Sequence, residues 1–130
     1  MLKRFVVPLT LLTSLVAALA LGAVPALAKD GDVLARGTCT GRSTAKLKLS
    51  PADGRIELEF EVDQNRTGVP WKVVLIRNGS RALRLTRVTR APSGSFTARR
   101  VLGNAAGADV VGATATRNGE RCSARATFRG

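Results

Sequence analysis

Histidine and tyrosine are absent from this sequence of 130 residues, and the aromatic residues are limited to Trp71 and four Phe. Without His, the chain lacks the commonest general base and the commonest metal ligand of proteins. So few aromatic residues leave little surface on which nucleic-acid bases or sugar rings could stack. We therefore expect a protein that is not an enzyme, binds no metal or other cofactor, and has no nucleic-acid partner.

The first 29 positions contain no acidic residue and have the pattern of an export signal. Lys3 and Arg4 give a positively charged start, and an apolar stretch runs from Phe5 to about Leu21. Small residues follow at Ala26 and Ala28, in the A-x-A arrangement typical of a cleavage site.

Cleavage after position 28 would divide the chain into a signal-peptide helix, residues 1–28, and a single mature domain, residues 29–130. The alternative is an uncleaved anchor, because residues 5–28 are long enough to span a bilayer. Pro25 and the polar Lys29 favour cleavage. No second hydrophobic stretch follows, so we expect no transmembrane segment after cleavage. The predicted location is extracellular, secreted or loosely associated with the cell wall.

Cysteine occurs only at Cys39 and Cys122, without a C-x-x-C motif. In an oxidising compartment, an even pair in a domain of this size predicts a disulfide. Such a bond would enclose most of the mature chain. Neither a catalytic nor a metal-binding use is expected, because no His can partner a thiolate.

Short alternating segments separated by turn residues dominate the mature sequence, and no helix is indicated. In the clearest pair, residues 46–50 and 55–62 flank Pro-Ala-Asp-Gly. A four-residue loop would pair Ser50 with Arg55 and place leucines and Ile56 on one face. On the other face, Lys48 would lie opposite Glu57 and Lys46 opposite Glu59, which predicts a solvated, neutralised ladder for the acidic row Glu57, Glu59, Glu61 and Asp63.

Two further hairpins are predicted around Asn-Gly turns. In the first, a three-residue loop at 78–80 places apolar residues of 71–77 opposite those of 82–89, and brings Arg87 towards Trp71 as a cation–π partner. In the second hairpin, a two-residue loop at Asn118-Gly119 places residues of the same face opposite one another. The expected pairs are Val73 with Leu85, Leu75 with Leu83, Arg117 with Glu120, Ala115 with Cys122, Ala113 with Ala124, and Val111 with Ala126.

About seven to eight short strands in this length predict an all-β fold, a two-sheet antiparallel sandwich. A small closed barrel is the alternative. Many inward positions of the last two strands are Ala, so that part of the core should be thin. The expected inward residues are Val33, Cys39, Leu47, Leu49, Ile56, Leu58, Phe60, Val62, Trp71, Val73, Leu75, Leu83, Leu85, Phe96, Val111, Cys122 and Phe128.

The sequence contains the segments G-T-C-T-G at 37–41, K-L-K-L-x-P-x-D-G-R-I-E-L-E-F-E-V-D at 46–63, N-G-S at 78–80, S-G-S-F at 93–96 and G-E-R-C-S at 119–123. With these segments it resembles small secreted actinomycete proteins without an assigned activity. The resemblance covers most of the mature chain. It implies an immunoglobulin-like secreted domain and no particular mechanism.

Charge is strongly unbalanced, with 21 Lys+Arg against 9 Asp+Glu and a net charge of +12. No acid lies between Gln64 and Ala108. If the strands of this stretch pair, their arginines would present fixed guanidinium forks suited to phosphate or carboxylate. The alternative is that this positive charge has no binding role, and that it keeps the protein soluble and protects a sheet edge. The candidate anion-binding residues are Arg84, Arg87, Arg90, Arg99 and Arg100.

Ser43 and Lys46 match S-x-x-K, the nucleophile and base of penicillin-binding enzymes, but the pair leads into a strand where a helix would be needed.

From the composition and the charge pattern together, we predict a monomeric, non-catalytic binding module for an anionic cell-wall polymer or an acidic protein surface. A secreted inhibitor or a small-ligand carrier is the alternative function. A hydrolase is the least favoured one.

Overall fold

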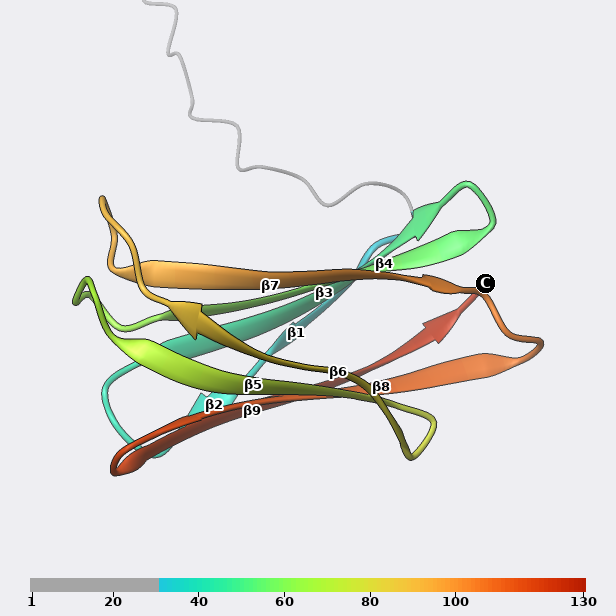
Figure 1. Ribbon diagram of the computed structural model, residues 1–130. Coiled ribbons are helices and arrows are strands. Elements are labelled where there is room, and N and C mark those ends of the chain that lie inside the picture. Colours follow the sequence, from blue (N-terminus) through green and yellow to red (C-terminus); the bar gives the residue numbers. More distant parts are fainter. Residues whose placement is uncertain (1–30) are drawn as a thin grey trace, which may run out of the picture.

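The computed structural model describes residues 31–130, and the predicted leader, residues 1–28, lies outside that range. The described chain forms two antiparallel sheets that pack face to face (Figure 1). One sheet has four strands in the order β1-β3-β4-β7, and the other has five in the order β2-β9-β8-β5-β6. The strands are β1 (Val33–Arg36), β2 (Thr38–Cys39), β3 (Thr44–Ala52), β4 (Arg55–Asp63), β5 (Pro70–Arg77), β6 (Ser80–Val88), β7 (Ser95–Gly103), β8 (Ala108–Arg117) and β9 (Glu120–Arg129).

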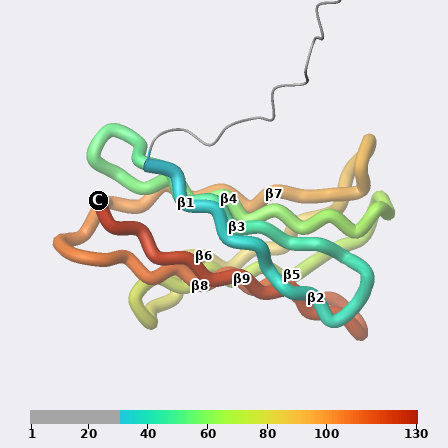
Figure 2. The backbone as a smooth tube through the Cα atoms, turned by 180° about the vertical axis from the view of Figure 1, so that it is seen from behind, coloured from blue at the N-terminus to red at the C-terminus, as the bar shows by residue number. Residues whose placement is uncertain are grey.

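The all-β prediction and the two-sheet prediction are confirmed, with more strands than expected. Residues 33–39 form two strands that separate at Gly37: β1 joins the four-stranded sheet, and β2 joins the other (Figure 2). At Gly37 a Cβ atom would lie 2.6 Å from the carbonyl oxygen of Ser123 and 2.9 Å from the Cβ of Ala45. Only glycine lets the backbone pass between the two sheets this closely.

Among residues 31–130 no helix is long and apolar enough to cross a membrane.

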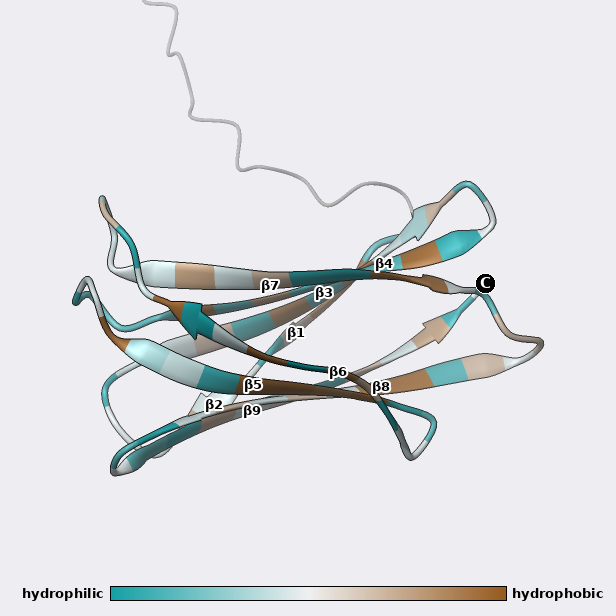
Figure 3. Cartoon of the chain, in the orientation of Figure 1, coloured by the Kyte–Doolittle hydropathy of each residue, from teal (hydrophilic) through white to brown (hydrophobic). Residues whose placement is uncertain are grey.

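Alternation of apolar and polar residues determines which face of each strand is buried, and it is visible as colour bands along the strands (Figure 3). Leu47, Leu58, Phe60, Trp71 and Leu75 are completely buried between the sheets. The thin part of the core is confirmed as well. It comes from the alanines that β8 and β9 bury, which are Ala113, Ala115, Ala124 and Ala126.

The predicted register of the β3–β4 hairpin is wrong by two residues. Ala52 pairs with Arg55, and Leu49 pairs with Leu58. The turn therefore contains only Asp53 and Gly54, whose φ angles of 50° and 72° are those of a primed two-residue turn. Such a turn matches the strand twist, so Asp-Gly determines the register and Pro51 stays in the strand. The shift by two residues leaves every side chain on its predicted face.

In the β5–β6 hairpin the predicted pairs, Val73 with Leu85 and Leu75 with Leu83, are confirmed, but the loop is different. Arg77 pairs with Ser80 across a two-residue Asn78-Gly79 turn. A register shift after Leu75 absorbs the additional residue. A bulge thus replaces the longer loop. The β8–β9 pairs follow the predicted register throughout.

The predicted disulfide between Cys39 and Cys122 is present. The two residues are directly paired across β2 and β9, with an S–S distance of 2.09 Å and Cα atoms 4.1 Å apart. The bond therefore lies within one sheet and fixes the short strand β2 to the last strand of the chain. A disulfide is consistent with an extracellular or otherwise oxidising environment.

Candidate functional site

The strands that carry the predicted anion-binding arginines do not pair in one sheet, so the premise of that prediction is wrong. Strand β6 is the edge of the five-stranded sheet, and β7 is the edge of the four-stranded sheet. A single bridge between Arg90 and Ser95 joins the segments where the chain passes from one sheet to the other. At this crossing a Cβ on Gly94 would meet the backbone of Asn65 and Arg66, so the chain turns tightly.

The five predicted arginines are consequently dispersed. Arg84 is exposed on the outer face of the five-stranded sheet, and Arg90 is exposed in the β6–β7 connection. Arg99 lies on the opposite face of the molecule. Arg87 and Arg100 occupy inward-directed positions of the edge strands, opposite Trp71 and Leu58. These residues do not form a common site.

Arg99 belongs to the acidic row of β4. Its guanidinium lies 2.6 Å from Glu59 and 3.8 Å from Glu57. Lys46 approaches Glu61 at 3.4 Å from the strand on the other side. The row is thus a neutralised ladder, as predicted, although Arg99 takes the place expected for a second lysine. Lys48 instead approaches Asp32 at 3.6 Å.

The outer face of the five-stranded sheet is uniformly basic. Burial and register direct alternate residues of its strands to solvent, and no acid of β2, β5, β6, β8 or β9 points that way. The two acids of these strands, Asp109 and Glu120, are buried on the inner side. We call this surface the basic face. Its cations are Lys72, Arg81, Arg84, Arg121, Arg125 and Arg129.

None of these cations makes an ion pair with any residue between 31 and 130. Sequence reasoning identified only Arg84 among them. A signal for three others was present, because Arg121, Arg125 and Arg129 recur every fourth residue on the outward side of a strand whose alternate residues are buried. All three lie outside the acid-free stretch from Gln64 to Ala108, on which the prediction depended.

The middle of the basic face is hollow. Strand β8 lies between β9 and β5, and its outward residues are half-buried and have no long side chain: Val110, Gly112, Thr114 and Thr116. A hollow of about 450 Å³ surrounds Gly112 and Thr114, with Arg36, Ser123 and Arg125 on its walls. A second hollow, of about 400 Å³, adjoins Thr116 and is lined by Lys72, Thr86 and Arg117.

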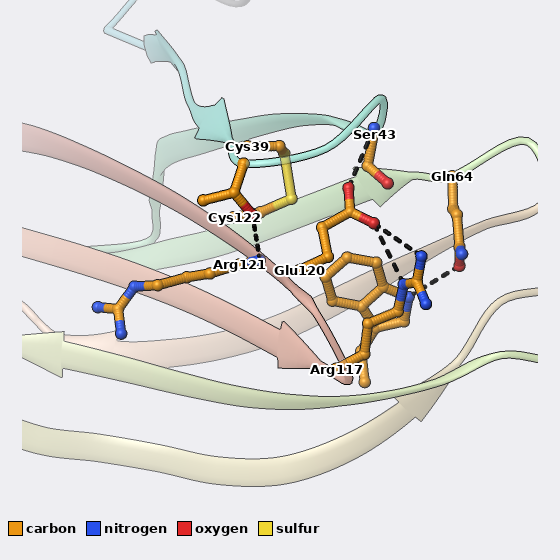
Figure 4. Close-up of a disulfide and its surroundings, with 9 residues drawn as sticks. Cys39, Ser43, Gln64, Arg117, Glu120, Arg121 and Cys122 are labelled. Carbon is orange, nitrogen blue, oxygen red and sulfur yellow. Dashed lines mark hydrogen bonds and ion pairs between the residues drawn. A yellow bond between two sulfur atoms is a disulfide. The ribbon is translucent and has the colours of Figure 1, made fainter.

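A separate polar cluster surrounds Glu120 beside the disulfide (Figure 4). The carboxylate accepts a hydrogen bond from the Ser43 amide at 3.1 Å and two from Arg117 at 3.2 and 3.0 Å. Burial alone would raise the pKa of Glu120. The hydrogen bonds from Ser43 and the charge and hydrogen bonds of Arg117 outweigh burial and lower the pKa below its ordinary value.

Arg117 also covers the indole ring of Trp71, with its guanidinium carbon 5.5 Å from the ring centroid. The expected partner, Arg87, instead donates to the carbonyl oxygen of Thr86 at 3.4 Å. The Trp71 Nε1–H donates to Gln64 at 3.1 Å. Each polar group of the cluster therefore has a structural partner, and we interpret it as a seal over one end of the core.

The residues that suggested chemistry are used structurally. Lys46 of the S-x-x-K match is directed to the outer face and paired with Glu61, whereas Ser43 is buried beside Glu120. Cys39, Glu120 and Cys122 offer ligand atoms within 4.8 Å of one another. Both sulfurs are bonded to each other, so they are not thiolate ligands.

Comparison of the chain with protein-family models, with curated proteins and with solved structures finds no match in any of the three.

Proposed function

We propose that this protein is a secreted, non-catalytic module that binds anionic polymers through the basic face. One observation carries the proposal: the two outer faces of the sandwich differ in charge. The outer face of the four-stranded sheet carries Glu57, Glu59, Glu61 and Asp63 among its cations, whereas the basic face carries no acid. Composition or solubility alone would distribute arginines over both faces.

The rigidity of the sheet supports the proposal. Neighbouring strands are about 4.8 Å apart, and residues four positions apart on one strand are separated by about 13 Å. The cations of β9 and of β5–β6 are therefore held in two rows, and binding of a polyanion does not require free energy to order the backbone that carries them. Guanidinium groups bind carboxylate and phosphate through two parallel hydrogen bonds.

Two finer expectations are proposals of the same kind. Export through a leader at residues 1–28 would bring the basic face to the cell surface or wall. An immunoglobulin-like subclass is supported by the neighbours β9-β8-β5-β6, which follow the order of strands G, F, C and C′. On the same assignment β3, β4 and β7 of the other sheet follow strands A, B and E, and β1 is an additional strand beyond A.

Salt-dependent binding tests the proposed function. On immobilised heparin we expect retention that falls steeply with salt, because each contacted anion releases counterions. The variant Arg121→Ser, Arg125→Ser, Arg84→Ser should elute at much lower salt than the native protein. A control that removes Arg66, Arg90 and Arg100, exposed cations outside the basic face, has the same net charge. Equal loss of retention in the two variants would mean that net charge alone is responsible, and the proposal would fail.

A further inference from the structure

We infer that the basic face binds one linear, hydroxyl-rich polyanion that lies along β8, between the two rows of cations. This inference rests on the proposed function and adds the shape and chemical class of the ligand. It is carried by the absence of side-chain bulk in the middle of the face. If the face had evolved only to meet a flat surface, nothing would require its central strand to be recessed.

The trough is defined by three adjacent strands. Strand β8 forms its floor, with Gly112, Thr114 and Thr116. Strand β9 forms one wall, where Arg125 pairs with Gly112 and Arg121 with Thr116. On the other side β5 contributes Lys72, which pairs with Thr116, and the exposed Ile76, which pairs with Gly112. The cations Arg81 and Arg84 lie one strand further out, on β6. Since β9 and β5 are two strand spacings apart, the walls are separated by about 10 Å, which is wide enough for a single extended polymer chain.

Cations alternate with hydroxyl groups along the β9 wall, in the order Arg121, Ser123, Arg125, Thr127 and Arg129. Across the trough, Thr114 pairs with Ser123, and Thr116 pairs with Lys72, which pairs with Thr86. Guanidinium and ammonium groups recognise the anionic group of a repeating unit, and threonine and serine hydroxyls both donate to and accept from sugar or polyol hydroxyls. A polymer of acidic sugars or of polyol phosphates offers both kinds of group in every repeat.

The same surface is poorly suited to other polyanions. The outward residues of β2, β5, β6, β8 and β9 include no aromatic side chain, so unpaired bases would have nothing on which to stack. A membrane is flat and would contact the walls but not the floor. A large side chain added to the floor of the trough should therefore weaken binding of a polymer that lies in the trough, but not binding of a membrane that contacts only the walls.

Gly112 allows the floor to be filled without damage to the fold. A Cβ atom at Gly112 would meet no heavy atom within 4 Å, and the backbone there is not in the left-handed region. Gly112→Trp should thus raise the floor and leave every charge in place. Thr97→Trp is the matched control, because Thr97 is exposed on β7, on the opposite outer face.

We would measure binding of the full mature protein to oligogalacturonate and to lipid-free poly(glycerol phosphate) by calorimetry. Gly112→Trp should weaken binding of at least one polymer by about tenfold, a loss of about 1.4 kcal/mol, while Thr97→Trp leaves affinity within about twofold. Preference for the first polymer would identify carboxylate as the recognised group, and preference for the second would identify phosphate. Vesicles containing phosphatidylglycerol and an oligothymidylate serve as the competing ligands.

Three results would overturn the inference: equal polymer affinity of Gly112→Trp and the native protein, tighter binding to the vesicles, or tighter binding to the oligothymidylate. If the charge variants of the basic face lose polymer binding but Gly112→Trp does not, the trough fails and the proposed function stands. If the charge variants retain polymer binding, the proposed function fails as well.

Discussion

Removal of the disulfide, by Cys39→Ala with Cys122→Ala, should destabilise the fold without abolishing it. The bond joins residues separated by 83 positions in the chain. Closing a loop of that length lowers the conformational entropy of the unfolded chain and is worth about 4.5 kcal/mol in the chain-entropy account. For a domain of about 100 residues this corresponds to a fall in Tm of about 20–30 °C.

The fold itself should persist, because β2 has other attachments. The Gly37 amide donates to the Ala45 carbonyl at 2.8 Å, and the Thr40 amide donates to the Arg121 carbonyl at 2.9 Å. The hydroxyl of Thr40 also accepts from the Arg121 amide at 3.0 Å. The two Thr40 bonds hold this end of the two-residue strand on β9, and the Gly37 bond attaches the residue before the strand to β3, whether or not the sulfurs are joined.

Urea denaturation of the native protein and the double variant provides the measurement. We expect a lower midpoint together with a larger m-value, because the unbridged chain exposes more surface when it unfolds. The native protein under reducing conditions should behave like the variant. If the free energy of unfolding falls by less than about 1.5 kcal/mol and the m-value is unchanged, the reasoning is refuted. The unfolded chain would then gain little conformational freedom when the disulfide is removed.

Three further changes test the packing and electrostatics. Gly94→Ala should lower the free energy of unfolding by about 3 kcal/mol, measured by thermal or urea denaturation, because its φ is +71° and the new methyl group would meet the Asn65–Arg66 backbone. The control Gly79→Ala, with φ +81° and open space around it, should lower the free energy of unfolding by about 1 kcal/mol. Gly112→Thr should stabilise the fold by about 0.5–1 kcal/mol, since threonine favours strands; a loss of stability would contradict the open floor of β8. The lowered pKa of Glu120 contributes stability above the pKa of the unfolded chain, about 4.3, and that contribution disappears as the pH falls through the lower folded value. Glu120→Gln should therefore be less stable than the native protein at pH 7, and the difference should shrink towards pH 3; a difference independent of pH would contradict the assignment.

The sequence predicted the two-sheet fold because alternation is a local property. Every strand from β3 to β9 follows its own pattern of apolar residues, and the cysteines indicated that the first and last strands meet. The division of the first strand at Gly37 was not predicted. Nothing local distinguishes a glycine at a switch between sheets from a glycine in a bulge.

The strand pairing assumed for the candidate arginines was wrong, because it depended on the order of strands in the sheets. The acid-free stretch lies on β5, β6 and β7, and neighbours in sequence were expected to be neighbours in a sheet. Strand β7 instead joins β4, where Arg99 pairs with Glu59, and β9 brings Arg121 and Arg125 into the five-stranded sheet. Tertiary pairing, which adjacent residues do not encode, therefore determines which cations share a face.

The most direct test of the central claim is to map where a polyanion touches the molecule. In an NMR titration of the isotope-labelled protein with oligogalacturonate and with a poly(glycerol phosphate) oligomer, we expect amide shifts at Gly112, Thr114 and Thr116 and at the neighbouring residues of β9 and β5. Shifts concentrated instead on β3, β4 and β7, or spread evenly over all exposed cations, would contradict the account.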